Sequence, residues 1–355
     1  MAISSLEYQN HGWDVKLPSI RAYTFHAEDI DRFIEKGQVP LDFDTNLVGG
    51  CNADCKYCAT EGGKSDVRFS NFNGHQKLSD DNLSQMIKQL NELGTRTFFI
   101  CSNGEPLLNP GRFLDILDNA GDTDLNIVTY TNATTLQNDF LKELHNRRVN
   151  LVMKLESFNP ELNDRIIFGK QNKSYEYAEF NGKTVPTGII EAFQVYGSDS
   201  DCLGIETMIL RDNIEEVLKI REWAYDLGSS QFLKHLYPLG YAKFRGEEVL
   251  PDSGREHELV QQIIDFDESY GFVYPDFLTP DHFSYDARRF MNNCVSSGQF
   301  PFRMFAHEAG GVYHSSQVVP EKFGFGTNLV IPVLDFDGGV DMKKYLEKIG
   351  ECLNG

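Results

Sequence analysis

The sequence lacks the long apolar runs and the basic clusters that mark two large classes of protein. No stretch of about 18 apolar residues is present that could span a bilayer. Lys and Arg number 33 against 53 Asp and Glu, which gives a formal net charge of −20 without any basic stripe. Nucleic-acid binding requires local positive charge. We therefore expect neither a membrane-embedded protein nor a nucleic-acid partner.

Cysteine is also scarce, and seven residues in 355 are too few for a disulfide-stapled scaffold. The first residues carry no basic segment followed by an apolar one, so we expect a cytoplasmic protein. A composition of 41% hydrophobic and 24% charged residues is that of an ordinary globular fold. Three of the seven cysteines fall within eight positions. In a reducing compartment this crowding indicates metal or redox chemistry.

Short apolar runs alternate with amphipathic stretches through the first two thirds of the chain. Strands are expected at residues 41–47, 96–101, 125–130, 149–155, 203–210 and 231–236. Helices are expected at residues 80–93, 110–119, 138–146, 188–196 and 213–227, with Ser79 or Asp80 as the first cap. Such repeats form parallel sheets whose functional loops follow the strand carboxyl ends. The pattern predicts an α/β fold with a full or partial barrel.

The pattern changes near residue 240. Beyond it, helices are expected at residues 256–270 and 342–352, with a loop-rich segment between them. We divide the chain into an N-terminal extension (1–40), a barrel domain (41–240) and a smaller α+β C-terminal extension (241–355). Cys101 and Cys202 lie on or beside predicted strands, and we expect them in the core because free cysteine is among the most buried residue types.

The crowded cysteines have the spacing C-x3-C-x2-C at Cys51, Cys55 and Cys58, directly after the first predicted strand. Three thiolates on one loop can ligate three irons of a cubane cluster and leave the fourth iron open to an exogenous ligand. The alternative is zinc, which takes four protein ligands in a structural site. The nearest further ligand is His75, beyond an intervening polar loop. The spacing therefore favours a [4Fe–4S] cluster.

This triplet, with Tyr57 before its last cysteine, resembles the signature of the radical S-adenosylmethionine (SAM) superfamily. Two later segments are also similar to that family. Residues 102–106 (Ser-Asn-Gly-Glu-Pro) resemble its Gly-Gly-Glu-Pro segment, with Asn103 in place of the first glycine. Residues 131–134 (Thr-Asn-Ala-Thr) resemble its Thr-Asn-Gly-Thr loop. The resemblance covers about residues 40–240 and implies a partial (β/α)6 TIM-like barrel that binds a [4Fe–4S] cluster and SAM.

The resemblance also implies which side chains and loops contact SAM. They are Tyr57, Asn103, Gly104, Glu105, Thr131, Asn132, Lys154, Glu156, Ser157, Glu206 and Arg211. Glu105, with the backbone around it, is expected to receive the SAM ammonium, because an acidic acceptor suits a charged donor. Lys154 or Ser157 is expected at the SAM carboxylate, and Glu156 at the ribose hydroxyls or the substrate.

The C-terminal extension resembles the SPASM or twitch domains that hold auxiliary clusters in many family members. Their pattern, a Cys followed by Gly-x4-Cys, is matched by Cys294 and Gly310 but ends in Ser315. Cys294 and Cys352 alone cannot complete a four-ligand site, so we expect a degenerate extension and a single cluster of about four irons. Cys294 has two interpretations, an inert remnant or a hydrogen-atom donor to a substrate radical.

Implied by the resemblance is a reduced cluster that cleaves SAM to methionine and a 5′-deoxyadenosyl radical, which abstracts hydrogen from a bound small molecule. An electron donor such as flavodoxin or ferredoxin is then required. Candidate pocket residues are Lys234, His235 and Tyr237 after the sixth predicted strand, and Arg303, His307 and Glu308 in the loop-rich segment.

Two substrate classes compete. Peptide-modifying members usually carry an intact SPASM region and often an N-terminal recognition module, for which the first forty residues are few. This favours a small polar metabolite such as a sugar, an aminocyclitol or a nucleoside. Without auxiliary clusters an oxidation lacks an internal electron acceptor, so epimerisation, dehydration or rearrangement is favoured. The alternatives are a peptide maturase, a dehydrogenase or, outside the class, a non-catalytic iron–sulfur or zinc protein.

Overall fold

The computed structural model describes residues 42–47, 50–58, 79–102, 104–169, 171–234 and 249–270, with short strands at 303–307, 311–314 and 331–332. The described strands of the main sheet run in the order β11-β10-β9-β1-β2-β3-β4-β7-β8. Their bounds are β1 (Asp42–Leu47), β2 (Thr97–Ser102), β3 (Asn126–Thr131), β4 (Val149–Lys154), β7 (Leu203–Met208), β8 (Ser230–Lys234), β9 (Arg303–His307), β10 (Gly311–His314) and β11 (Ile331–Pro332).

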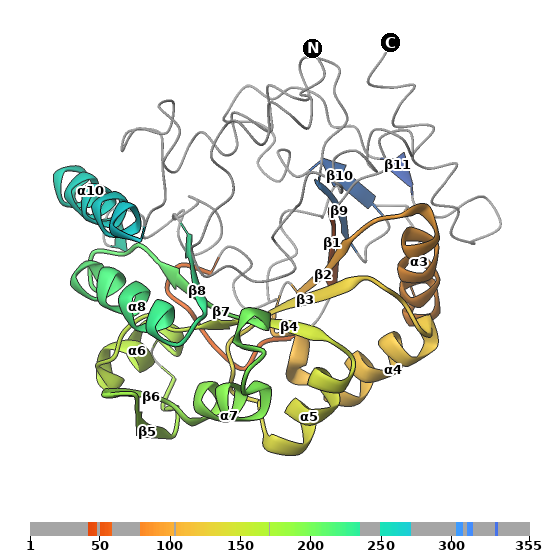
Figure 1. The fold of residues 1–355 in the computed structure, drawn as a ribbon, viewed down its shortest axis with the longest axis horizontal. Coiled ribbons are helices and arrows are strands. Elements are labelled where there is room, and N and C mark those ends of the chain that lie inside the picture. Colours follow the sequence, from red (N-terminus) through yellow and green to blue (C-terminus); the bar gives the residue numbers. More distant parts are fainter. Residues whose placement is uncertain are drawn as a thin grey trace, which may run out of the picture.

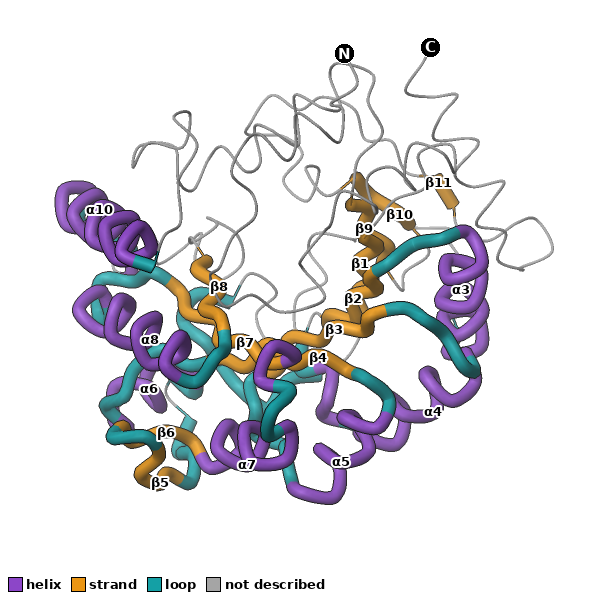
Figure 2. The backbone as a smooth tube through the Cα atoms, in the orientation of Figure 1, coloured by secondary structure: helices purple, strands orange, loops and turns teal. Residues whose placement is uncertain are grey.

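The strands from β9 through β1 to β8 pair in parallel, and the sheet curves into a trough with helices on its convex side (Figures 1 and 2). The helices are α3 (Asp80–Leu93), α4 (Pro110–Ala120), α5 (Asn138–Asn146), α6 (Pro160–Ile167), α7 (Thr187–Tyr196), α8 (Ile214–Asp226) and α10 (Ser253–Ser269). Within the described strands, β8 does not pair with β11, so the barrel stays open. The predicted α/β partial barrel is confirmed.

Local sequence signals account for most element bounds. Helices α3 and α5 occupy the predicted residues, and Ser79 caps α3 by accepting a hydrogen bond from the Asn82 N–H. Gly94 ends α3 in the left-handed conformation, with φ of 96°. The β4–β7 connection holds elements that the sequence analysis missed: α6 and the hairpin of β5 (Tyr177–Phe180) and β6 (Lys183–Pro186). An Asn-Pro start signal for α6 was present at Asn159 and Pro160.

The loop-rich interpretation of residues 303–307 was wrong, because these residues form strand β9. They pair in parallel with β1, Asp42 opposite Arg303 and Asn46 opposite His307. The partner strand lies more than 250 residues away in the chain, so a local pattern does not reveal the pairing. The proposed domain boundary near residue 240 and the SPASM-like character of the C-terminal extension stay predictions.

The main hydrophobic core lies between the sheet and the helices of the convex face. Strand residues such as Phe98, Ile127 and Leu151 alternate toward this face and pack into one cluster with Met86 and Leu90 of α3. All five side chains are buried. Burial of a side chain of this kind contributes about 1.5–3 kcal/mol, so this face contributes strongly to stability.

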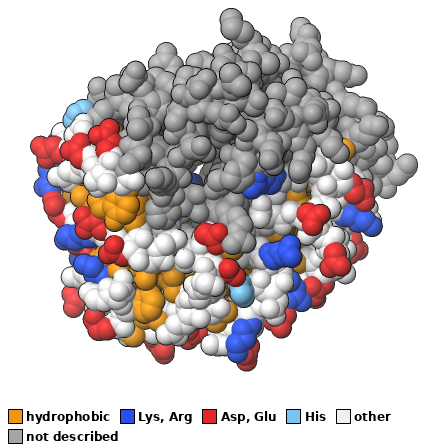
Figure 3. Space-filling model, viewed as in Figure 1, with side chains coloured by type: hydrophobic (Ala, Val, Ile, Leu, Met, Phe, Trp, Pro, Cys, Tyr) orange, Lys and Arg blue, Asp and Glu red, His pale blue; other side chains and the backbone are white. Residues whose placement is uncertain are grey.

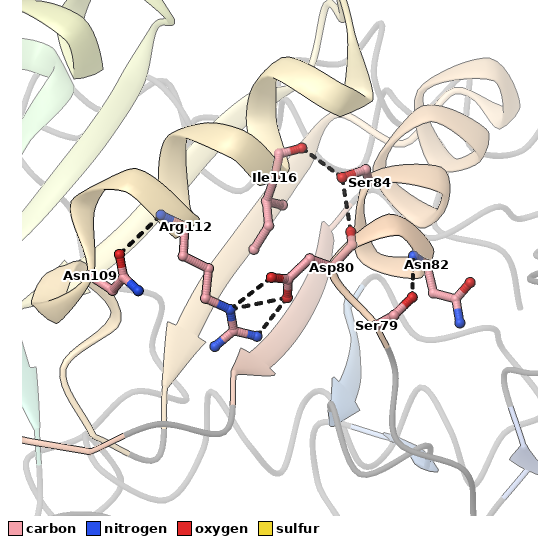
Figure 4. Close-up of polar contacts among 7 residues, drawn as sticks. All are labelled: Ser79, Asp80, Asn82, Ser84, Asn109, Arg112 and Ile116. Atoms are coloured by element: carbon pink, nitrogen blue, oxygen red, sulfur yellow. Dashed lines mark hydrogen bonds and ion pairs between the residues drawn. The ribbon is translucent and has the colours of Figure 1, made fainter.

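Helices α3 and α4 are joined at their N-terminal ends by polar contacts (Figure 4). The Arg112 guanidinium binds the Asp80 carboxylate through Nε and Nη2, with a shortest N–O distance of 2.7 Å. The Ser84 hydroxyl contacts the Asp80 and Ile116 carbonyls, each at 2.9 Å. Asn109 caps α4 through the Arg112 N–H. These contacts join the first half of α3 to α4.

Helices α8 and α10 share a buried ion pair. Arg221 of α8 donates through Nε and Nη2 to both carboxylate oxygens of Asp267 in α10, at 2.7 and 2.5 Å. Asp267 is fully buried and Arg221 almost so. Elsewhere, acidic and basic side chains are interspersed over the described part of the face in Figure 3. No helix in the described ranges is both long enough and apolar enough to cross a membrane.

Candidate active site

The three cysteines lie on the loop that follows β1, at the carboxyl edge of the parallel strands. Cys51, Cys55 and Cys58 are half-buried. The Cys58 N–H donates to the Cys55 carbonyl at 3.0 Å, which closes a tight turn between the last two cysteines. The Ala53 N–H points at the Cys51 sulfur at 3.4 Å. The loop therefore presents all three thiols within one short, internally bonded segment.

The chemistry of these donors fits an iron–sulfur cluster. Burial raises the pKa of the Cys55 thiol to about 12, and burial also raises that of Cys51 against the opposing effect of the Ala53 N–H. Ligation to iron requires thiolates, so the neutral form favoured by burial must lose its proton on binding. Among the described residues, no three His, Cys, Asp or Glu side chains form a group able to hold one metal ion. A cubane takes one thiolate per iron and does not need such convergence.

Glu105 follows β2 and connects three loops at the strand edge. Its Oε1 accepts hydrogen bonds from the Leu107 N–H at 3.0 Å and the Thr131 hydroxyl at 2.7 Å. Its Oε2 accepts one from the Asn132 N–H at 2.7 Å, while its own N–H donates to the Gly50 carbonyl. Burial raises the pKa of this carboxyl against those three donors. All of these partners are protein groups, and contact between Glu105 and the SAM ammonium stays a prediction.

The loop after β3 lies against the cysteine loop. Asn132 donates from Nδ2 to Asn52 Oδ1 at 2.9 Å, and the same nitrogen lies 4.0 Å from the Cys51 sulfur. Asn52 Nδ2 in turn donates to the Thr134 hydroxyl at 2.6 Å. Ala133, where the family has glycine, adopts a left-handed φ of 61°. The predicted Asn132 site thus contacts the cysteine loop directly.

Tyr57 and Glu156 form a buried polar pair between the cysteine loop and the end of β4. The Tyr57 hydroxyl donates to Glu156 Oε1. The second oxygen accepts the Met208 N–H at 2.9 Å and Asn213 Nδ2 at 3.3 Å. Burial raises the pKa of Glu156 to about 7. The sequence analysis placed Glu156 at SAM or the substrate, whereas its described partners are protein groups.

Two further residues predicted to contact SAM, Ser157 and Arg211, form hydrogen bonds with groups outside the cysteine loop. The Ser157 hydroxyl contacts Glu216 at the start of α8 and the Asn159 N–H, at 3.4 and 3.0 Å. Arg211 is exposed and donates from Nε to the Leu250 carbonyl at 3.1 Å. Neither contact supports a role at SAM, so both assignments stay predictions.

Lys154 and Glu206 stand side by side at the carboxyl ends of β4 and β7. They are paired in register, and Lys154 Nζ lies 3.7 Å from Glu206 Oε1. The ammonium also sits 5.1 Å from the centre of the Tyr57 ring. Burial alone would lower the pKa of Lys154, but Glu206, Cys55 and Glu156 together raise it. A firmly protonated lysine beside the cysteine loop suits an anionic group.

The inner face of the trough combines an apolar floor with polar groups near the carboxyl ends. Phe99, Val128 and Val152 form the floor, with Tyr130 and Phe232 packed against it. Lys234, a predicted pocket residue at the end of β8, holds its ammonium 5.1 Å from the centre of the Tyr130 ring. Tyr130 was missed by the sequence analysis, since a lone strand tyrosine gives no functional signal.

The remaining candidates divide by position. Gly104 is described and adjoins Glu105. Cys202 is partly buried against the convex-face core, as expected for a structural thiol. The others lie outside the described residues or have no described side chain: Cys101, Asn103, His235, Tyr237, Cys294, Arg303, His307 and Glu308. Asn213 and Asn163 were missed as site residues, although each stands at or near a helix start, where Asn is a common cap.

The described residues thus form an open parallel α/β barrel, with a thiol triplet after β1 and polar groups at the strand ends around it. The family model described as the radical SAM superfamily matches residues 45–224, about half of the chain. The chain belongs to the radical SAM superfamily. It is therefore an enzyme of SAM-dependent radical chemistry that uses a [4Fe–4S] cluster and SAM.

Comparisons with individual proteins agree with this family. A GTP 3′,8-cyclase from Rippkaea orientalis is 33% identical over 132 residues, which is 36% of this chain and 38% of that protein. SuiB from Streptococcus suis, solved with SAM, aligns over 86% of this chain and 66% of its own with a TM-score of 0.52 and 10% identity. The structure of anSMEcpe with AdoMet and a Kp18Cys peptide aligns over 82% and 77% with a TM-score of 0.50 and 13% identity. At these identities the structures show a shared fold.

Proposed function

We propose that this enzyme abstracts hydrogen from a small polar biosynthetic substrate, such as a sugar, an aminocyclitol or a nucleoside, bound on the inner face of the trough. The observation that carries this proposal is the inner face itself. Lys154, Glu206 and Lys234 give charged groups of both signs above the apolar floor. Small-ligand sites combine such a floor with a few convergent polar groups. The similar cyclase is named for GTP, which is also a polar nucleotide.

The residues of the chain would divide the work of binding. Cys51, Cys55 and Cys58 would hold the cluster, which when bound supplies the electron that cleaves SAM. Lys154 carries a positive charge beside that loop and would bind the carboxylate of SAM. The apolar floor below offers no hydrogen-bonding groups to water, and a site poor in water would protect a reactive radical from side reactions.

We further propose that the reaction is an epimerisation, a dehydration or another rearrangement. Ser315 stands where SPASM domains have their cysteine, so an internal electron acceptor is not expected. A peptide substrate is the second candidate, favoured by the alignment with anSMEcpe, which was solved with a bound peptide. We place the enzyme in the cytoplasm with a flavodoxin or a ferredoxin as its electron donor, because the cluster must be reduced by one electron.

The test is a substrate panel with the anaerobically reconstituted protein. SAM, dithionite and candidate sugars, aminocyclitols, nucleosides and peptides are combined, and 5′-deoxyadenosine and altered substrate are followed by mass spectrometry. We expect one polar metabolite to stimulate SAM cleavage and to pass deuterium into 5′-deoxyadenosine. Stimulation by peptides alone would replace the proposal with the peptide candidate.

A matched pair of lysine variants locates the substrate. Lys234→Met removes the ammonium over Tyr130, and Lys183→Met removes one at the same 5.1 Å over the Phe158 ring, away from the trough. A charge-assisted contact is worth about 1.5–3 kcal/mol, so Lys234→Met should raise the substrate KM roughly ten- to a hundredfold. Lys183→Met should leave KM unchanged. Equal KM values in both variants would remove Lys234 from the substrate site.

A further inference from the structure

The cysteine loop is bonded to the end of a helix that the sequence analysis missed. The Asp54 N–H donates to the Ile167 carbonyl at 2.9 Å, and the Lys56 N–H donates to the Ile166 carbonyl at 3.2 Å. The last carbonyls of a helix have no partner within the helix. Here the backbone between the cluster ligands supplies the missing donors, so the end of α6 and the loop satisfy each other.

Apolar packing reinforces these two bonds. Ala53 is buried in one cluster with Ile167 and Phe168, against which Cys51 and Cys55 pack. Beyond α6, the Lys173 ammonium donates to the Asn52 carbonyl at 3.0 Å. The loop is thus held along its length by the residues from 166 to 173 that the structure describes.

Helix α6 is in turn fixed to the strand edge. Asn163 is fully buried, and its Oδ1 accepts the N–H groups of Glu156 and Ser157 at 2.9 and 3.3 Å. Its Nδ2 donates to the Tyr177 hydroxyl at 3.0 Å. One short helix therefore links the end of β4, where Lys154 stands, to the cysteine loop.

Gly169, which follows α6 and has a φ of 60°, faces the Asp54 backbone in this contact. A Cβ added there would lie 2.8 Å from the Asp54 carbonyl oxygen and 3.3 Å from Asp54 Oδ2. Backbone at 2.8 Å cannot yield by rotating a side chain. Only glycine allows α6 and the cysteine loop to approach this closely.

We propose that α6 and Gly169 form a docking platform that holds the cysteine loop in its cluster-binding shape before iron and sulfide bind. Gly169 is then a positioning residue for the cluster, acting through the Asp54 backbone. The platform spares the cluster the cost of ordering the loop, since fixing backbone dihedral angles costs conformational entropy. This inference does not depend on the substrate class.

The test compares Gly169→Ala with Gly182→Ala. Gly182 also has a positive φ, 74°, but nothing lies within 4 Å of an added Cβ, so its variant carries backbone strain without the contact. Gly169→Asn and Gly182→Asn form a second pair, because Asn tolerates positive φ better than Ala while keeping the Cβ. The second pair decides the matter if Gly169→Ala does not fold.

In the cluster-free form of each variant, amide exchange at Asp54 and Lys56 and thermal unfolding are measured. After anaerobic reconstitution, the iron and sulfide contents and the EPR spectrum of the reduced protein are measured. We expect protection of both amides to fall at least about tenfold in the Gly169 variants, equal to about 1.4 kcal/mol. Iron content should fall severalfold and the EPR spectrum should change, while unfolding temperatures match those of the Gly182 variants. Equal amide-exchange rates and equal iron contents in the Gly169 and Gly182 variants, whether high or low, would overturn the proposed platform.

Discussion

The two faces of the sheet are built from different kinds of contact. On the convex face, strand residues pack into one large apolar core with the helices. On the inner face the apolar floor is small, and the strand ends above it carry buried polar groups such as Glu105, Glu156 and Glu206. Buried polar groups are tolerated when they bond to one another. The comparison teaches that the convex face supplies stability, while the inner edge exchanges some of it for a fixed arrangement of loops.

The largest difference in effect between substitutions at the inner edge and on the convex face is expected for the cysteines predicted to bind the cluster. Cys51→Ala, Cys55→Ala or Cys58→Ala should abolish both the cluster absorbance and 5′-deoxyadenosine formation, because three irons of the cubane require three thiolates. Cys202→Ala, on the convex side, should retain both, and so should Cys101→Ala. Absorbance spectra and product assays after reconstitution check this. Normal SAM cleavage in a triplet variant would falsify the ligand assignment.

The converse change breaks the convex side and spares the site. Asp267→Ala leaves the buried Arg221 guanidinium without its carboxylate, and breaking a buried pair this way costs about 3–5 kcal/mol. Denaturant unfolding should show that loss, while iron content per folded chain stays at the wild-type level. The double variant Arg221→Met with Asp267→Leu should recover most of the stability, because no charge is then left unpaired. A large loss of cluster in Asp267→Ala with little loss of stability would contradict the division of roles.

Variants of Glu105 test whether one residue of the inner edge contributes both to stability and to SAM binding. Glu105→Ala leaves the buried N–H groups of Leu107 and Asn132 without acceptors, at about 1–3 kcal/mol for each such loss. SAM affinity should fall roughly ten- to a hundredfold if the carboxylate or its loops hold the ammonium.

Glu105→Gln should lose less stability and less SAM affinity than Glu105→Ala, because its amide oxygen still accepts some of these hydrogen bonds. Calorimetric titration of the clustered protein and denaturant melts separate the two effects. Reduced stability with unchanged SAM affinity would make Glu105 a structural residue alone.

The smallest effect is expected at Ala133, in the loop after β3. Its φ of 61° is strained for any residue with a Cβ, so Ala133→Gly should raise the unfolding free energy by about 1 kcal/mol. Ala192→Gly within α7 is the control and should lower stability, because glycine weakens a helix interior. Chemical unfolding measures both. Stability changes of the same sign in the two variants would show that backbone strain does not govern this loop.

Much of the fold was predictable because its signals are local. The caps at Ser79 and Gly94 bound α3 where the sequence placed it, and the alternation of apolar runs located the six parallel strands from β1 to β8 within one or two residues. The cysteine spacing predicts the ligand loop, because three ligands of one cluster can lie on eight consecutive residues.

Other features depended on surfaces that are distant in the chain. The pairing of Lys154 with Glu206 requires the register between β4 and β7, and the bond from Tyr57 to Glu156 joins residues 99 positions apart. The docking of α6 on the cysteine loop has no signal in either segment alone. Strand β9 was missed for the same reason, since only its contact with β1 makes it a strand of this sheet.

The sequence by itself therefore determined the class of chemistry, the candidate ligand loop and most of the order of strands and helices of the barrel. Periodicity and caps report which face of an element is buried and where it ends, and ligand spacing reports a loop that needs no distant partner. Only the tertiary structure decided which buried carboxylates bond to protein groups, which cation stands beside the thiols, and what holds the cysteine loop. These follow from which surfaces meet, and that is set by packing of the whole sheet and its helices rather than by any short segment.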